Sequence, residues 1–363
     1  RSFHLTAPAP ESPLSSISLT SGLMLVHGNH PEALRDLLVT WIRRYPLAPL
    51  ETETVLVHSN GIAQWLRLAL AEDVEDGGCG IAAGLDLSLP SRFLWQAYRA
   101  VLGREAVPEA SPFDKPLLVW RLMRLLPDLT GQAAYQPLRR FLAADADLRK
   151  RFQLAERLAD LFDQYQVYRA DWLAAWAAGE DVLIRAAGER APLPDEQRWQ
   201  ACLWRALLAD VAAGGNADLA GQGRAAVHEA FLARVAGWPD DAPRPAGLPR
   251  RVLVFGISAL PRQSLEVLAA LARWSQVLMC VHNPCEHYWS DIVADKELLR
   301  ATRSRQQRRA GAPAEIDEDS LHLHAHPLLA AWGKQGRDFI GLLDEHDSDT
   351  ARAGYLQHFA DIR

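Results

Sequence analysis

Short apolar runs alternate with amphipathic segments at the start of the chain. Residues 23–26 and 54–57 are apolar runs that predict strands. Each is followed by a turn and by apolar residues at helical spacing, over about 31–44 and 63–72. Two successive strand–turn–helix units favour a parallel α/β sheet.

The pattern then becomes helical almost throughout, from about residue 91 to residue 237. Its most amphipathic segments are 117–126, 154–168 and 197–212. Glycine- and proline-rich stretches over 214–223 and 238–249 predict loops or linkers.

An apolar strand returns at 251–257, followed by an expected helix over 263–274 and another strand over 277–282. The simplest architecture is an α/β domain that is interrupted by an all-helical insertion. The domains expected are a disordered arm or tag over 1–23, a first α/β part over 24–90, the insertion over 91–245, and the continued α/β domain over 246–363 with an exposed Arg-rich loop at about 300–319.

Residues 159–176 combine a polar cluster with an aromatic stripe. Asp160, Asp163 and Gln164 share one face of the predicted helix because they are three or four residues apart. Aromatic residues recur at the same spacing on a second face, and Asp171 is expected to cap a turn that begins at Trp172. An aromatic core stripe beside a solvated acidic face is the simpler interpretation.

Composition sets limits on the class of protein. The net charge of −6 over 363 residues argues against a generally basic nucleic-acid coat but allows a local basic channel. The 12 tryptophans are well above usual, and tryptophan is common in interfaces and in nucleic-acid stacking platforms. The 4 cysteines form no CxxC pair, so reduced thiols are expected. No apolar run is long enough to span a bilayer, and residues 1–23 lack the apolar core of a signal peptide, which makes Met24 a reasonable start.

The residues of a nucleotide site are missing. The first strand–turn–helix has no Gly-Lys-Ser/Thr: His30 is nearest the expected lysine, and Pro31 removes an N–H donor. The strand at 251–257 ends in Gly-Ile-Ser rather than in the acidic residues that hold a metal. An ordinary α/β domain that never bound nucleotide has the same appearance, and both features count against an active nucleic-acid-dependent ATPase.

Metal and nucleophile sites are weakly supported. His322, His324 and His326 alternate as zinc ligands on a strand could, but no partner ligand has matching spacing. Cys280 and Cys285 have no oriented base nearby and are interpreted as core thiols. We expect no catalytic residue and no metal ligand in this chain.

Several long motifs occur in a specific order. They are LVHSNGIAQWL (56–66), GIAAGLDLSLPSRFLW (80–95), ADLFDQYQVYRADWLAAW (159–176), VFGISALP (254–261), NPCEHYWSDI (283–292) and HPLLAAWGKQGRDFIGLL (326–343). Together they resemble the amino-terminal portion of RecC, the gamma subunit of the RecBCD helicase–nuclease (exodeoxyribonuclease V).

The resemblance implies a fold and a function. The fold would be an inactivated superfamily 1 helicase-like domain, a P-loop-like parallel sheet with the helical insertion. The chain would belong to a non-catalytic subunit for double-strand break repair and recombination, which binds the unwound 3′-terminated strand and recognises the regulatory sequence Chi. Partners would be RecB and RecD, single-stranded DNA and duplex ends, with no membrane. ATP and magnesium would be bound by the partner subunits, and the location would be the bacterial cytoplasm at the nucleoid.

The resemblance also places the Chi-reading positions on particular residues. They are His58, Asn60, Gln64, Leu89, Trp95, Asp160, Leu161, Asp163, Gln164, Arg169 and, less securely aligned, Arg224. His58 stands where the family pattern has glutamine and Asn60 where it has threonine, so the preferred DNA sequence is expected to differ.

Structural interpretations compete with these assignments. Leu89 and Trp95 could equally be core residues, and Gln64 could simply decorate its helix. The arginines over 300–309 could track phosphates or form a solvated loop. An assembly scaffold that holds the motor subunits without reading sequence is the alternative function.

Overall fold

The structure, a computed structural model, describes residues 19–143, 148–185, 188–214, 222–239, 242–285, 289, 329, 332–347 and 354–358, with only the backbone for 345–347 and 354–358. The Arg-rich segment 300–319 and the three alternating histidines lie outside these residues, as do residues 1–18 of the expected arm. The first strand begins at Gly22, so the arm boundary expected at residue 23 falls inside a strand.

One end of the molecule is built around a six-stranded sheet with the order β3-β2-β6-β7-β1-β8. Each strand of this sheet runs parallel to its neighbours. Its strands are β1 (Gly22–Gly28), β2 (Glu53–Val57), β3 (Leu85–Ser88), β6 (Arg251–Phe255), β7 (Gln276–His282) and β8 (Gly354–His358). The four strands predicted at 23–26, 54–57, 251–257 and 277–282 therefore lie in one parallel sheet. Strands β3 and β8 were not predicted.

Helices cover both faces of this sheet. α1 (Pro31–Arg44) and α2 (Asn60–Ala71) pack on one face through Leu38 and Leu66, against strand residues such as Val55 and Phe255. α3 (Pro90–Leu102), α9 (Arg224–Ala236), α10 (Arg262–Leu271) and α13 (Lys334–Asp347) carry the core residues of the other face. The strands are buried on both faces, which is why they are continuous apolar runs.

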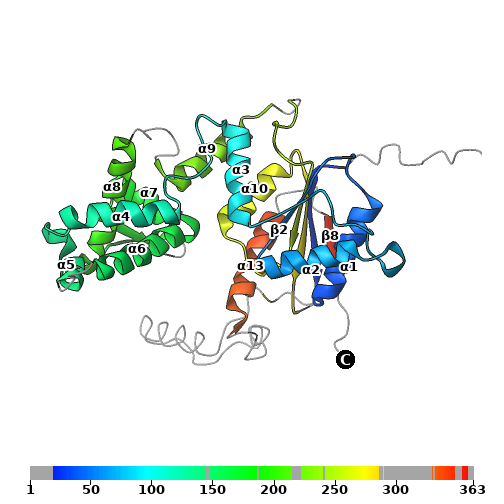
Figure 1. The fold of residues 1–363 in the computed structure, drawn as a ribbon, viewed down its shortest axis with the longest axis horizontal. Coiled ribbons are helices and arrows are strands. Elements are labelled where there is room, and N and C mark those ends of the chain that lie inside the picture. The colour runs from blue at the N-terminus through cyan, green and yellow to red at the C-terminus, as the bar shows by residue number, and fades with distance from the viewer. Residues whose placement is uncertain are drawn as a thin grey trace, which may run out of the picture.

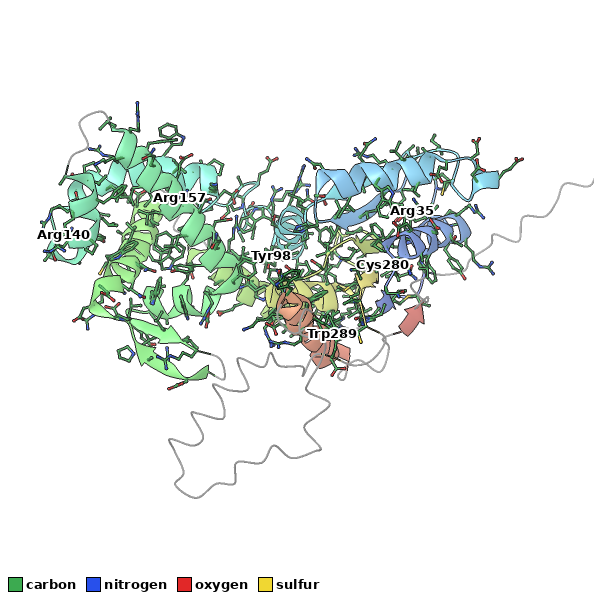
Figure 2. All side chains as sticks on the ribbon, turned by 90° about the horizontal axis from the view of Figure 1, so that it is seen from below. Arg35, Tyr98, Arg140, Arg157, Cys280 and Trp289 are labelled. Atoms are coloured by element: carbon green, nitrogen blue, oxygen red, sulfur yellow. The ribbon has the colours of Figure 1, made fainter. Side chains whose placement is uncertain are left out.

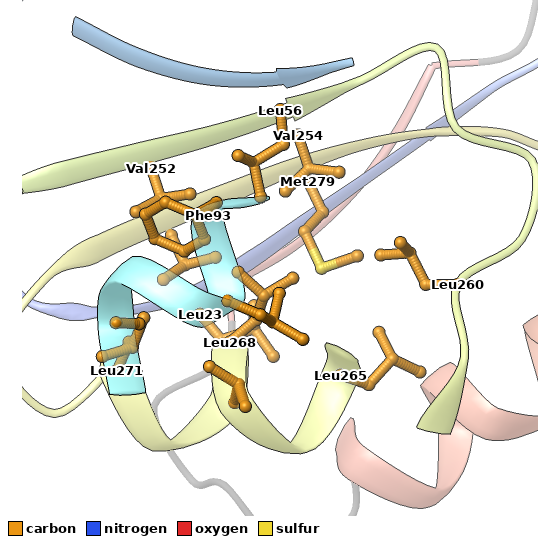
Figure 3. Close-up of a cluster of buried hydrophobic side chains, with 14 of the residues drawn as sticks. Leu23, Leu56, Phe93, Val252, Val254, Leu260, Leu265, Leu268, Leu271 and Met279 are labelled. Atoms are coloured by element: carbon orange, nitrogen blue, oxygen red, sulfur yellow. The ribbon is translucent and has the colours of Figure 1, made fainter. Parts of the chain in front are cut away.

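The second face shows how segments far apart in sequence meet. Leu56, Val254 and Met279 project from neighbouring strands toward Leu265 and other residues of α10 (Figure 3). Strand residues alternate between the two cores, because successive side chains of a strand point to opposite faces. Fully burying one such side chain stabilises the fold by about 1.5–3 kcal/mol.

A second core lies at the other end of the molecule, where α4 to α8 pack together (Figure 1). Its elements are α4 (Lys115–Leu129), α5 (Gln136–Leu142), α6 (Arg149–Tyr168), α7 (Ala170–Ala177), α8 (Arg198–Ala213) and the antiparallel strands β4 (Val182–Ile184) and β5 (Arg190–Pro192). The hairpin corrects the expectation that this region is all-helical. Short 3₁₀ turns, also unpredicted, occupy Val74–Asp76, Ala133–Tyr135 and Asp195–Gln197.

The aromatic stripe on α6 and α7 belongs mainly to this second core. Tyr165 contacts Trp172 and Trp176, with ring centroids 5.5 and 5.8 Å apart. The two indole N–H groups donate to the carbonyls of Ile184 and Val182, each at 2.9 Å. These bonds hold β4 against α7, so a three-residue strand forms there without a strong strand pattern of its own.

The break between α6 and α7 differs from the prediction. α7 begins at Ala170 with Arg169 at the N-cap position, rather than with Asp171 as the cap of a turn beginning at Trp172. Asp171 lies in the first turn and accepts two hydrogen bonds from Arg169, at 3.0 and 2.8 Å. A carboxylate in the first turn is also favoured by the helix dipole.

The two cores do not divide at the boundaries expected at residues 91 and 245. α3 and α9 pack on the sheet, whereas the buried residues of the second core run from Phe113 to Val211. Within the described part of the chain, no helix combines the length and apolarity needed to cross a bilayer.

Candidate nucleic-acid interface

The carboxyl ends of the parallel strands meet at one edge of the sheet, where α/β proteins commonly bind ligands. β2 ends just before His58, β3 just before Leu89, and β6 just before Gly256. Gly256 has φ +66°, and a Cβ placed there would lie 2.9 Å from two atoms of the Ile62 side chain. Glycine is therefore required at the end of β6, where a metal-binding acidic residue would stand in a nucleotide site.

The turn after β1 is bonded to the end of β7. The Asn283 amide donates to the Gly28 carbonyl at 2.9 Å, and His282 Nε2 lies 3.2 Å from the Asn29 carbonyl. The Asn283 side chain in turn accepts a 2.8 Å bond from the buried indole of Trp289. In a nucleotide-binding protein, this turn would be the phosphate-binding loop. Here its carbonyl groups contact Asn283 and His282 of the same chain.

We expect the chain to show no DNA-stimulated ATPase activity. The turn lacks a lysine, Pro31 occupies the first helical position, and Gly256 replaces the acidic end of β6. Phosphate release would be measured with magnesium and single-stranded DNA present. Turnover that copurifies with the chain would contradict this expectation.

A groove of about 620 Å³ opens between this edge of the sheet and the last turn of α6. Tyr98 lies at the junction of the two ends of the molecule, where the groove is found (Figure 2). Four of the residues assigned to Chi reading line it, namely His58, Leu89, Trp95 and Arg224. They come from three separate parts of the sequence.

The side chains of the groove combine stacking surface with polar groups. His58 is exposed and Leu89 is 47% exposed, so neither is a core residue. Trp95 is half-buried and donates to the Pro108 carbonyl at 2.9 Å, which fixes its ring. Tyr168 is 64% exposed at the groove, the one member of the aromatic stripe on α6 that leaves the core.

Arg224 joins three helices at the floor of the groove. Its guanidinium donates to Asp114, before α4, at 2.6 Å and to Asp163, on α6, at 3.4 Å. All three side chains are partly exposed. Asp163 thus reaches the groove through Arg224, although it does not itself line it.

The other assigned residues of α6 lie around the groove rather than in it. Asp160 pairs with Lys115 at 2.5 Å, a contact that raises the pKa of the lysine. Gln164 is exposed and Leu161 half-buried. Arg169 is held away from the groove, with its guanidinium bonded to Asp171 and Ile184 and stacked over a tryptophan ring.

Asn60 and Gln64 lie on α2, directly after His58. Both are exposed, and their spacing of four residues puts them on one face of the helix. Ser59 caps this helix by accepting a bond from the Ile62 amide at 3.3 Å. Neither residue lines the groove.

A buried hydrogen-bonded triad behind the groove, Tyr98, His228 and Glu266, was not predicted from the sequence. Tyr98 Oη lies 2.9 Å from His228 Nδ1, and His228 Nε2 lies 2.8 Å from a carboxylate oxygen of Glu266. Burial raises the pKa of Tyr98, so it stays a neutral hydroxyl. These three side chains connect α3, α9 and α10, and they fix the wall of the groove on which Tyr98 lies.

Cys280 is a core thiol, as predicted, and its burial raises the pKa to about 12, which leaves almost no reactive thiolate. Among the residues that the structure describes, no group of three His, Cys, Asp or Glu side chains could hold a metal.

Comparison with known proteins decides the family. The family model described as "RecC, N-terminal domain" matches residues 23–359. The chain belongs to the RecC family. It is 37% identical to the RecBCD enzyme subunit RecC of Escherichia coli strain K12 over 94% of this chain and 29% of that protein. It is 34% identical to the subunit of the same name from Haemophilus influenzae, over 89% of the chain and 31% of that protein. The chain thus spans about a third of the length of these RecC relatives.

Proposed function

We propose that this chain is the amino-terminal part of a non-catalytic RecC subunit of a DNA helicase–nuclease complex with RecB and RecD. It would act in the bacterial cytoplasm, bind the unwound 3′-terminated strand and take part in reading Chi. The observation that carries the proposal is the groove, which brings together His58, Leu89, Trp95 and Arg224 from distant parts of the chain.

The chemistry of the groove suits a single strand with unstacked bases. Trp95 and Tyr168 offer aromatic surface, on which each stacked base contributes about 1–3 kcal/mol. His58 can donate or accept a hydrogen bond at a base edge. The positive and negative charges of the lining are nearly balanced: the arginines are Arg92, Arg99 and Arg224, and the carboxylates are Glu109 and Asp114. Base contacts rather than phosphate contacts should therefore dominate binding.

The fold supports a helicase-like origin as part of the same proposal. β1 leads into α1 through a turn at the position of a phosphate-binding loop, and β6 lies one strand away from β1 across β7. We propose that the inserted helical module is the second core, from Phe113 to Val211, which is narrower than residues 91–245. α3 and α9 then connect that module to the sheet domain.

One further surface favours the scaffold role as an additional function. Trp120 on α4 is 66% exposed and Phe152 on α6 is 37% exposed, with ring centroids 6.1 Å apart. Leu117, one turn before Trp120, is 44% exposed. Exposed aromatic clusters of this kind are typical of protein–protein contacts.

We expect single-stranded DNA binding by the chain to depend only weakly on salt. One phosphate contact on a single strand contributes a slope of about −0.7 in log K against log salt. Arg92 is exposed at the groove, so Arg92→Ala should make the slope shallower by about that amount. Fluorescence anisotropy of a labelled oligonucleotide, titrated at several salt concentrations, would measure it.

Arg140→Ala is the matched control for that measurement. Arg140 is exposed at the far end of the helical module (Figure 2) and should leave the slope unchanged. A steep dependence of log K on log salt that becomes shallower by the same amount in both variants would indicate general charge attraction. That result would remove the groove from the proposal.

A further inference from the structure

Gln166 on α6 carries a buried acceptor that no protein group satisfies. Its side chain is 1% exposed, and its Nε2 donates to the Phe113 carbonyl at 3.2 Å. Oε1 has no hydrogen-bond partner among the described residues. Because only the NH₂ end can donate to a carbonyl, the amide cannot be turned round, and the free atom must be the acceptor. Leaving a buried acceptor unpaired destabilises the folded chain.

Gln166 lies between two hollows. On one side is the groove, and on the other is a second hollow of about 510 Å³, and both Gln166 and Arg224 line each of them. The volume is within the range of about 300–1,000 Å³ that ligand pockets occupy. Gln222 and Glu229 are the other polar residues that line it.

The walls of this second hollow are mostly apolar and small. Ala174 and Ala177 on α7 face Ala209 and Ala212 on α8, so the two helices leave space between them. Gly223, before the start of α9, lines the hollow beside the Trp204 ring: its φ is +100°, and a Cβ there would lie 3.3 Å from that ring. The hollow thus combines apolar walls with one buried acceptor.

These features define the chemistry of an occupant. A phosphodiester or carboxylate has no proton to give to Gln166 Oε1, and the Arg224 guanidinium that lines the hollow is already paired with Asp114 and Asp163. A nucleobase has apolar faces, and each of the four DNA bases carries an N–H donor, either as an amino group or on the ring. We propose that the second hollow receives one unstacked base of the strand in the groove, with Gln166 accepting its N–H. This inference rests on the proposed function and adds a reading position that the family resemblance did not assign.

The energetics are compatible with a single flipped base. Taking a base out of a single-stranded stack costs little compared with opening a duplex. The bond to Gln166 removes an unsatisfied acceptor, so it contributes more than an exposed hydrogen bond would. A base that lacks an N–H donor, such as 3-methylthymine, should be rejected from the position because the acceptor would stay unpaired.

The test uses this chain and single-stranded oligonucleotides with 2-aminopurine at successive positions. One position should become brighter on binding, because its base leaves the stack. Ala209→Phe, at an exposed site on the wall of the hollow, should abolish that signal and weaken binding by about two- to tenfold. Gln166→Met should weaken binding to a similar extent while keeping the volume of the side chain.

Ala213→Phe is the matched control, since Ala213 is exposed on the same helix but does not line the hollow. It should leave both the bright position and the affinity unchanged. An unchanged bright position in Ala209→Phe would overturn the inference while leaving the proposed function intact. Equal affinity for oligonucleotides with thymine and 3-methylthymine at the bright position would overturn it as well. Failure of the unaltered chain to bind any strand would overturn the proposed function and this inference with it.

Discussion

Replacing Glu53 with alanine is expected to lower the free energy of unfolding by about 3–5 kcal/mol, because it leaves a buried charge without its partner. Arg251 is fully buried, and its Nε donates to Glu53 at 3.0 Å within a bidentate pair. Arg251 also donates to the Tyr45 carbonyl at 2.7 Å. The pair joins the first residues of β2 and β6, so losing the carboxylate leaves an uncompensated guanidinium buried there.

Chemical denaturation followed by circular dichroism would measure this loss. Glu51→Ala is the control. Glu51 lies two residues before Glu53 and pairs with Arg250, but both side chains are partly exposed, so this substitution should cost less than about 1 kcal/mol. Replacing Glu53 and Arg251 together with methionine should recover most of the stability. Equal losses in Glu53→Ala and Glu51→Ala would show that burial does not distinguish the two pairs.

Asp163→Ala is expected to reduce discrimination between Chi and unrelated sequence by about tenfold or more when introduced into the full-length subunit of the three-subunit complex. Without Asp163, Arg224 keeps only Asp114 as a partner and is no longer held across the floor of the groove. Contacts elsewhere would still hold the strand. Chi-dependent fragment production and the unwinding rate would be measured side by side.

Glu156→Ala provides the comparison for that experiment. Glu156 is an exposed carboxylate on the same helix, and it does not line the groove. It should leave fragment production unchanged. Loss of unwinding and of Chi response to the same degree in Asp163→Ala would indicate a structural role for Asp163 instead.

The structure changes what is expected of Arg169. Its guanidinium already donates two hydrogen bonds to Asp171, and its central carbon lies 3.8 Å from the centroid of the Trp172 ring. In this arrangement Arg169 cannot donate a bidentate pair of hydrogen bonds to a guanine edge. Its assignment to Chi reading remains a prediction. A substitution there would act first on the contact between α7 and the β4–β5 hairpin.

The sequence predicted the main strands because both faces of a parallel sheet need apolar residues. It missed β3, a four-residue strand that follows a glycine-containing loop, and the hairpin, which depends on indole bonds from another helix. Periodicity could not show either, since their stabilisation is non-local. The cap at Asp171 was placed wrongly because its carboxylate bonds a side chain rather than a helix amide.

The candidate site was predictable only in part, and by a different route. Family resemblance assigned His58, Leu89, Trp95 and Arg224, and the structure brings these four to one groove. Gln166 gave no signal because a single glutamine in an amphipathic helix is ordinary. Only its depth and its unpaired oxygen distinguish it.

The crowding at Gly256 also limits how this protein could change over evolutionary time. An aspartate introduced there would collide with Ile62 and would have to adopt a left-handed backbone conformation. Accommodating it would therefore also require a smaller residue at position 62. The residues allowed at position 256 thus depend on the residue at position 62, and substitutions at the two positions are expected to be epistatic.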